Sequence, residues 1–255
     1  MRNKRFIFTV TSGRSGTKYL ARIIGLFGDT LSLHEPEPSY VMCMREVQSD
    51  PNLAVRFLLE KKIPAISRDA SKRIYVETSH LFCKGFLEAW LSLPELPIPD
   101  LVLLDRDLRS LALSLLRLDT IPGRTVSGLR WYLAPSDQSC LTSIENWRDM
   151  NDYQLCYWYC LEIEERKNRY KELIQSVGGR AVRISIQDLK RATKLRDFQK
   201  QLDLPALSPA GWLRYFAIRS NVLNRKESRV HRVIYTAEEM DGFEAQVNAC
   251  LLRKN

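Results

Sequence analysis

The sequence predicts an α/β fold of three layers, in which helices cover both faces of a mostly parallel sheet. Short apolar runs alternate along the chain with segments of helical periodicity. The run 101–104 is apolar at every position, which is typical of a strand buried on both faces. The length of 255 residues and the hydrophobic content of 45% suffice for one domain spanning residues 1–255.

Five runs are predicted as strands. The first is rich in β-branched and aromatic residues, and the second is followed by prolines that favour an extended exit. The predicted strands are 6–10, 30–33, 73–77, 101–104 and 181–186. Ligands of such sheets bind at the carboxyl ends of the strands, so the residues directly after these runs are candidates for the site.

Helical patterns fill most of the remaining chain. Asp107 stands where a helix N-cap is expected, and Gly178-Gly179 ends the longest helix. Within that helix, Glu162 and Arg166 have the i, i+4 spacing of an ion pair. The predicted helices are 19–26, 84–92, 108–118, 144–177, 194–202 and a terminal helix near 237, with broken helices over 40–69.

Two long segments lack a regular pattern. Residues 119–143 predict a loop, and a loop of this length in a compact domain is typically a lid or a binding loop. We expect it to form the wall for an acceptor together with 40–70. Residues 212–232 are basic and are predicted to be irregular.

The net charge of +9 suits a polyanionic partner. A basic nucleic-acid-binding domain is one candidate, although the basic residues are dispersed and no reader motif is present. A small, multiply charged nucleotide explains the excess charge equally well. No apolar run is long enough to cross a membrane, and the run after the basic N-terminus is too short for a secretory signal, which predicts a cytoplasmic protein. Cys156 and Cys160 are predicted to pack in the core rather than bind metal.

Residues 11–18, Thr-Ser-Gly-Arg-Ser-Gly-Thr-Lys, form a small-residue loop between the first strand and the first helix. Gly13 and Gly16 allow close approach of the backbone to a ligand. The helix that follows directs its free N–H groups and positive dipole end at the loop, where an anion is favoured. The loop is therefore predicted to bind phosphate or sulfate.

A kinase that uses ATP and Mg²⁺ is an alternative enzyme for this loop. Nucleoside-triphosphate loops have the pattern GxxxxGK[ST]. In this chain the order Gly16-Thr17-Lys18 displaces the lysine and the hydroxyl, and the four-residue gap between glycines is missing. The sequence has no clear acidic residue at a strand end to hold magnesium, and Asp105 is the one candidate that can be argued for that role.

The loop resembles the phosphosulfate loop of the PAPS-dependent sulfotransferases, whose tyrosylprotein and carbohydrate branches have an Arg-Ser-Gly-Thr core. A second family motif places an Arg at a strand end and a Ser eight residues later, and Arg106 and Ser114 have this spacing. Residues 186–189, Ile-Gln-Asp-Leu, are similar to the family's aromatic-Glu-Asp-Leu segment. The family's late Arg-Lys-Gly segment is replaced by 224–227, Asn-Arg-Lys-Glu.

The resemblance implies the sulfotransferase fold, a relative of the P-loop nucleotide hydrolases. It also implies transfer of a sulfuryl group from 3′-phosphoadenosine 5′-phosphosulfate (PAPS), leaving adenosine 3′,5′-bisphosphate (PAP), without a metal. The acceptor is a hydroxyl or amine of a small molecule, carbohydrate, lipid or peptide. Arg106 and Ser114 would hold the 3′-phosphate. The residues that would hold the 5′-phosphosulfate are Ser12, Gly13, Arg14, Ser15, Gly16, Thr17 and Lys18.

An acceptor hydroxyl also needs a proton acceptor within hydrogen-bond reach. Glu35 follows the loop at about the interval at which the tyrosylprotein branch has its catalytic Glu. His80, in Thr78-Ser79-His80-Leu81, resembles the Lys-Thr-His-Leu segment of the cytosolic branch, although Glu77 or Thr78 stands near the place of its Lys. We expect Glu35 to be the base, with His80 as an alternative base or as a group that orients the acceptor or the sulfate.

Overall fold

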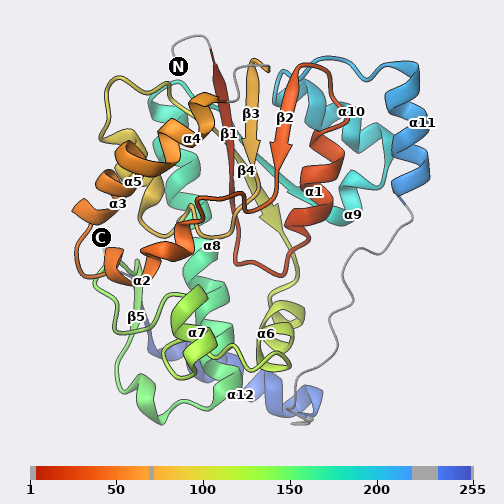
Figure 1. Ribbon diagram of the computed structural model, residues 1–255. Coiled ribbons are helices and arrows are strands. Elements are labelled where there is room, and N and C mark those ends of the chain that lie inside the picture. The colour runs from red at the N-terminus through yellow and green to blue at the C-terminus, as the bar shows by residue number, and fades with distance from the viewer. Residues whose placement is uncertain (1–3, 69–71, 220–234, 254–255) are drawn as a thin grey trace.

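The computed structural model describes residues 4–68, 72–219 and 235–253. Its centre is a five-stranded sheet in the order β2-β3-β1-β4-β6, and every pairing in it is parallel (Figure 1). The strands are β1 (Arg5–Val10), β2 (Thr30–Leu33), β3 (Ile74–Glu77), β4 (Asp100–Asp105) and β6 (Ala181–Ser185). All five predicted strands are present, and the α/β fold with a parallel sheet is confirmed.

One face of the sheet is covered by four helices. Ile7, Val102 and Leu104 point to this side and pack into a core cluster with Leu20 and Ile23. Along each strand, residues belong alternately to the cores on the two faces of the sheet, because successive side chains point to opposite faces. The helices are α1 (Thr17–Ile24), α9 (Ile186–Leu189), α10 (Ala192–Gln201) and α11 (Pro209–Ile218).

The opposite face carries the larger core. Phe6, Phe8 and Leu103 pack there, and the rings of Phe8 and Phe82 stack with centroids 3.9 Å apart. The central helix of this layer is α8 (Asp152–Ser176), which packs against α6 (Leu108–Leu116). The other helices on this side of the sheet contribute residues to the larger core or pack against it. They are α2 (Met44–Val47), α3 (Asn52–Phe57), α4 (Ile63–Arg68), α5 (Phe86–Leu91), α7 (Val126–Trp131) and α12 (Ala237–Cys250).

The segment 119–143 is more regular than predicted. It contains α7, which begins because Thr125 Oγ1 accepts a hydrogen bond from the Gly128 amide at 3.0 Å. A Cβ at Gly128 would lie 1.9 Å from the Ile121 carbonyl oxygen, so this short helix depends on a close backbone approach. The segment ends in β5 (Thr142–Ile144), which pairs in antiparallel fashion with β7 (Leu251–Arg253).

Two predicted boundaries are wrong for reasons of capping. The longest helix begins at Asp152 rather than at 144, because Asn151 and Gln154 form a reciprocal capping box. The first part of the segment 212–232 belongs to α11, which begins after Ser208 with Pro209 in its first turn, and residues 220–234 lie outside the described part of the chain. Residues 186–189 form the short helix α9.

The carboxyl ends of the sheet strands point toward the side of the molecule that carries α6 and α7 (Figure 1). The loops that follow β1, β2, β3 and β4 therefore meet at this edge, as expected for parallel strands. Among the helices of the described residues, none combines the length and the apolar character needed to cross a membrane.

Candidate functional site

A cavity of about 740 Å³ opens at the carboxyl edge of the sheet. It is lined by the loop before α1, by the segments that follow β2, β3, β4 and β6, and by the end of α7. The predicted site residues that line it are Arg14, Ser15, Gly16, Thr17, Lys18, Glu35, His80 and Arg106. Residues from positions far apart in the chain thus meet in one cavity.

The backbone of the loop before α1 takes left-handed conformations at Gly13, Arg14 and Gly16, with φ of 81°, 55° and 92°. Glycine adopts this conformation freely, whereas it is uncommon for a residue with a Cβ such as Arg14. Gly16 also has no room for a side chain, because an added Cβ would lie 2.7 Å from Cγ1 of Ile186. The short helix α9 therefore packs directly on the loop.

The loop hydroxyls mostly stabilise the loop itself. Ser12 Oγ and Ser15 Oγ both donate to the Gly13 carbonyl, at 3.1 and 3.0 Å, and Tyr159 donates to the Ser12 carbonyl at 3.0 Å. Ser12 and Gly13 thus lie behind the cavity wall, while Ser15 lines it. Gly16 caps α1 without a side-chain hydrogen bond, so the amides of the first helical turn are not capped by a side chain.

Arg14 and Arg106 bring two guanidinium groups to the same place. Arg106 Nη1 donates to the Arg14 carbonyl, and Arg14 Nε lies 3.4 Å from Ser114 Oγ. Burial lowers the pKa of Arg106, and the positive charge of Arg14 lowers it further. Within the described residues, neither arginine nor Lys18 has a carboxylate at ion-pair distance, so these three cations are left without a direct ion-pair partner and can bind an anion in the cavity.

The helix α6 supplies a second group of residues after β4. Asp107 caps it by accepting from the Ser110 amide at 2.8 Å, which confirms the predicted cap. Ser110 lines the cavity, whereas Ser114 does not. The hydroxyl of Ser114 faces the guanidinium of Arg14 instead. Asp105 is bound to Lys167 at 3.0 Å and to Arg183 at 3.2 Å, so both of its oxygens already face cations.

Glu35 and His80 come together across the ends of β2 and β3. Oε1 of Glu35 lies 3.6 Å from Nε2 of His80, and both residues line the cavity; the Glu35 side chain is 29% exposed, while His80 is nearly buried. Glu35 has a left-handed φ of 48°. The turn after it is held by Lys62, whose Nζ donates to the carbonyls of Pro36 and Pro38 at 3.2 and 3.0 Å.

Sequence reasoning did not identify Lys84 as part of the site. It lies four residues after His80, in the turn before α5, and its Nζ is 3.1 Å from Nδ1 of His80. Burial, followed by the charge of Lys84, lowers the pKa of His80 well below its ordinary value, so the imidazole is neutral at neutral pH. The spacing His80-x-x-x-Lys84 was the only signal in the sequence, and the spacing alone does not distinguish it from a surface pair.

Of the two segments predicted as an acceptor wall, 119–143 contributes residues to the cavity lining and the described residues of 40–70 do not. Trp131 and Tyr132 at the end of α7 line the cavity together with Leu118 and Thr120. The predicted replacement for the late family segment, 224–227, lies outside the described residues. Within the described residues, no group of three or more His, Cys, Asp or Glu side chains is placed to hold a metal ion.

No family model matches the sequence, and no curated protein matches it. Among solved structures, the chain is similar to one described as "Sulfotransferase Domain from the Curacin Biosynthetic Pathway". The TM-score is 0.53 at 14% sequence identity, over 82% of this chain and 76% of that chain. The fold is similar to that of a sulfotransferase domain. At this identity the likeness shows the fold alone.

Proposed function

We propose that this protein transfers a sulfuryl group from PAPS to a hydroxyl or amine of an acceptor. One observation carries the proposal: a single cavity holds both arginines without carboxylate partners and a carboxylate–imidazole pair. The arginines fit the negative charges of the donor, and the pair fits removal of the acceptor proton. The three sequence motifs and the similar fold support the same assignment.

The loop before α1 fits the 5′-phosphosulfate end of the donor. Arg14 and Lys18 supply positive charge, and the uncapped amides of Gly16 to Lys18 supply donors at the positive end of α1. Ser15 and Thr17 line the same part of the cavity and are almost fully buried. These residues together can bind the phosphate and sulfate oxygens without a metal ion among them.

Arg106 fits the 3′-phosphate, as the resemblance implies. Two serines on α6 are candidates for a second contact to the 3′-phosphate. Ser114 is the match by sequence spacing, but its hydroxyl faces Arg14, whereas Ser110 lines the cavity one turn earlier. We assign Ser110 to contact with the 3′-phosphate and Ser114 to the placement of Arg14.

In the transfer, the acceptor oxygen or nitrogen forms a bond to sulfur while the bond between sulfur and the 5′-phosphate oxygen breaks. Negative charge grows on the leaving phosphate, and donors that are fixed beforehand stabilise it without reorganising. Arg14 is such a donor, because its conformation and its contact with Ser114 are set by the loop and by α6. Glu35 accepts the acceptor proton, since its carboxylate reaches the cavity beside His80.

Isothermal titration with PAP tests the donor site. We expect binding, and we expect Arg106→Ala to weaken it by roughly 10- to 100-fold, the cost of a lost hydrogen bond to a charged group. Arg117→Ala is the matched control, because Arg117 is an exposed arginine at the end of α6, the helix that follows Arg106, and does not line the cavity. Absence of PAP binding, or equal binding by the Arg106 variant, would contradict the proposal.

A transfer assay separates the proposal from a kinase. The protein is incubated with sulfur-35-labelled PAPS and a panel of phenols, sugars, lipids, peptides and amines, and in parallel with labelled ATP and Mg²⁺. We expect label transfer from PAPS that persists in EDTA. Transfer from ATP that EDTA abolishes would support the kinase, although Asp105, which a kinase would need for Mg²⁺, is already bound to Lys167 and Arg183.

A further inference from the structure

Lys84 is a fully buried lysine beneath the site, and the reaction proposed above does not use it. Its side chain lies between the rings of Tyr132 and Tyr159, with Nζ 4.8 and 5.2 Å from their centroids. Nζ donates to the Trp131 carbonyl and lies 3.1 Å from Nδ1 of His80. Among the carboxylates of the described residues, none lies within ion-pair distance of it. A buried cation without a carboxylate is costly and requires a reason.

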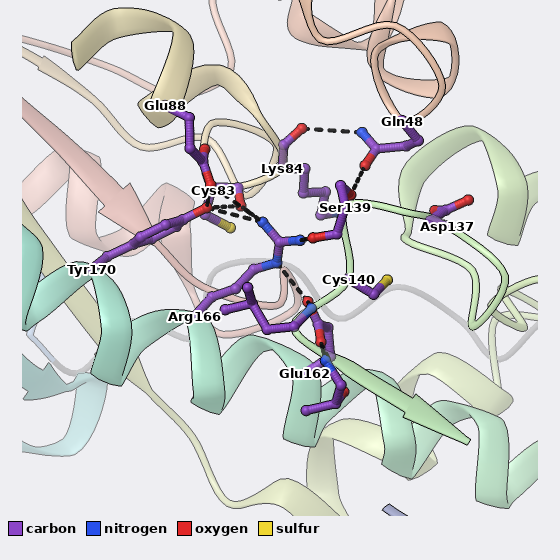
Figure 2. Close-up of polar contacts among 12 residues, drawn as sticks. Gln48, Cys83, Lys84, Glu88, Asp137, Ser139, Cys140, Glu162, Arg166 and Tyr170 are labelled. Atoms are coloured by element: carbon purple, nitrogen blue, oxygen red, sulfur yellow. Dashed lines mark hydrogen bonds and ion pairs between the residues drawn. The ribbon is translucent and has the colours of Figure 1, made fainter. Parts of the chain in front are cut away.

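The main chain around Lys84 is held in place by buried polar side chains (Figure 2). Gln48 Nε2 donates to the Lys84 carbonyl at 3.1 Å, and Arg166 Nη1 donates to the Cys83 carbonyl at 3.0 Å. The hydroxyl of Tyr170 also donates to the Cys83 carbonyl, at 3.2 Å. Because the carbonyls of Cys83 and Lys84 are both hydrogen-bonded to core side chains, the core fixes the position of the Lys84 side chain under His80.

An ammonium group has three donors and no acceptor. While Lys84 is charged, as it mostly is at pH 6, Nδ1 of His80 must therefore accept from it through its lone pair. A neutral imidazole carries one proton on its two ring nitrogens, so that proton lies on Nε2. Nε2 is the atom that lies 3.6 Å from the Glu35 carboxylate.

We propose that Lys84 is a positioning residue that fixes His80 in the tautomer protonated at Nε2. His80 then donates a hydrogen bond into the cavity, to Glu35 or to an oxygen of the transferred group, and it has no lone pair there to act as a base. Glu35 is thereby left to accept the acceptor proton. This assignment of roles rests on the proposed sulfuryl transfer, whereas the tautomer itself does not.

The charges around the pair favour the same state. Burial is the main reason that His80 stays neutral, and the positive charges of Lys84 and Arg14 add to it. Burial also lowers the pKa of Lys84 to about 7, so the lysine is mostly charged at pH 6. The other titratable groups that act on His80 or Lys84 are His34, Glu35, Arg45, Cys83 and Arg166.

Nitrogen-15 NMR of histidine-labelled protein at pH 6 tests the tautomer directly. The chain has three histidines, so His34→Asn and His231→Asn assign the His80 signals. We expect neutral His80 with its proton on Nε2. In Lys84→Met, we expect the Nδ1–H tautomer or the imidazolium to appear, because the donor to Nδ1 and a positive neighbour are both lost. Lys84→Arg, which restores a donor without an acceptor, should restore the Nε2–H tautomer.

Lys18→Met is the control, since it removes a lysine from the cavity wall and leaves Lys84 in place. We expect it to leave the His80 signals unchanged. A wild-type His80 that is protonated on Nδ1, or that is an imidazolium at pH 6, would overturn the proposal, and so would a Lys84→Met protein with the wild-type tautomer and His80 pKa. If Lys84→Met does not fold, the wild-type spectrum and Lys84→Arg decide.

Titration of the same proteins with PAP keeps the two proposals apart. Lys84 does not line the cavity, so we expect Lys84→Met to bind PAP within about twofold of wild type, as for a change away from the ligand. Wild-type protein with the Nε2–H tautomer and no PAP binding would overturn sulfuryl transfer and support the tautomer. PAP binding with the opposite tautomer would overturn the role of Lys84 alone.

Discussion

Nε2 of His80 lies 3.6 Å from Oε1 of Glu35, and Nδ1 on the other side of the same ring lies 3.1 Å from Nζ of Lys84. The ring thus bridges a carboxylate that reaches the cavity and a buried lysine. Its two nitrogens face groups of opposite charge, which fixes the direction in which the ring donates and accepts.

Glu35→Gln tests the base. We expect the variant to lower the rate of label transfer from PAPS by about 10²- to 10⁴-fold, the usual contribution of a general base, because an amide cannot accept the proton. PAP affinity should be unchanged or tighter, since a negative charge is removed from an anion site. Initial rates with the best acceptor of the panel, together with PAP titration, measure both effects. Wild-type transfer rates would assign the base elsewhere.

His80→Asn tests whether His80 or Glu35 is the base. An amide keeps a donor for Glu35 or the transferred group, so we expect a smaller loss of rate than in Glu35→Gln. If His80 were the base, its replacement would cost as much as that of Glu35 or more. The comparison of the two transfer rates at one pH decides between the candidates that the sequence left open.

The sheet could be predicted because each strand is a short apolar run that ends in a polar or small residue. The loop before α1 was equally recognisable, since its glycines and hydroxyls follow the first strand directly. The contact between Lys84 and His80 could not be predicted, because it depends on how the segment between β3 and α5 folds back under the loop. The sequence also could not show which serine of α6 lines the cavity. Ser110 and Ser114 are one helical turn apart, and the structure places Ser110 in the lining.

Burial was the other property that the sequence did not reveal. Glu162 and Arg166 were predicted as a helical pair from their spacing, which is typical of exposed helix faces. The structure places both in the core, where Arg166 Nε lies 2.7 Å from Glu162 Oε1. A polar pair of this kind interrupts the apolar pattern, so periodicity alone assigns it to the surface.

Gly13→Ala should destabilise the fold and displace His80. Gly13 has a φ of +81°, and an added Cβ would lie 3.1 Å from Cγ of His80. We expect a loss of about 1–3 kcal/mol in the free energy of unfolding, the cost of a strained left-handed residue. Thermal or urea unfolding measures it. Gly242→Ala is the matched control, because it lies in α12 with nothing within 4 Å of an added Cβ and should stabilise by about 0.5–1 kcal/mol.

Lys84 should make stability depend on pH. Burial lowers its pKa from 10.5 to about 7 in the folded protein. Between these values the unfolded chain binds a proton that the folded chain does not, so the free energy of unfolding rises with pH, by up to about 1.4 kcal/mol per pH unit. Lys84→Met lacks this contribution. Urea unfolding of both proteins at pH 7 and pH 9 measures it, and a difference that does not change with pH would contradict the shift.

Arg166→Met should destabilise the fold more than Gly13→Ala does. Arg166 binds Glu162, the Cys83 carbonyl, the Ser139 carbonyl and Tyr170 within the core (Figure 2). Its removal leaves the Glu162 carboxylate buried without its cation, although the amides of Leu141 and Thr142 still donate to it. Breaking a buried pair in this way costs about 3–5 kcal/mol in the free energy of unfolding, which urea unfolding measures.

The double variant Glu162→Gln with Arg166→Met separates charge from packing. A neutral amide no longer needs a cation, so we expect the double variant to recover part of the stability that Arg166→Met loses, and the coupling appears in a double-mutant cycle of urea unfolding. Arg169→Met on the exposed face of the same helix should change stability by less than about 0.5 kcal/mol. Additive effects of the two core substitutions would show that Arg166 acts through its carbonyl contacts instead, as the support for Cys83 and hence for the backbone that positions Lys84.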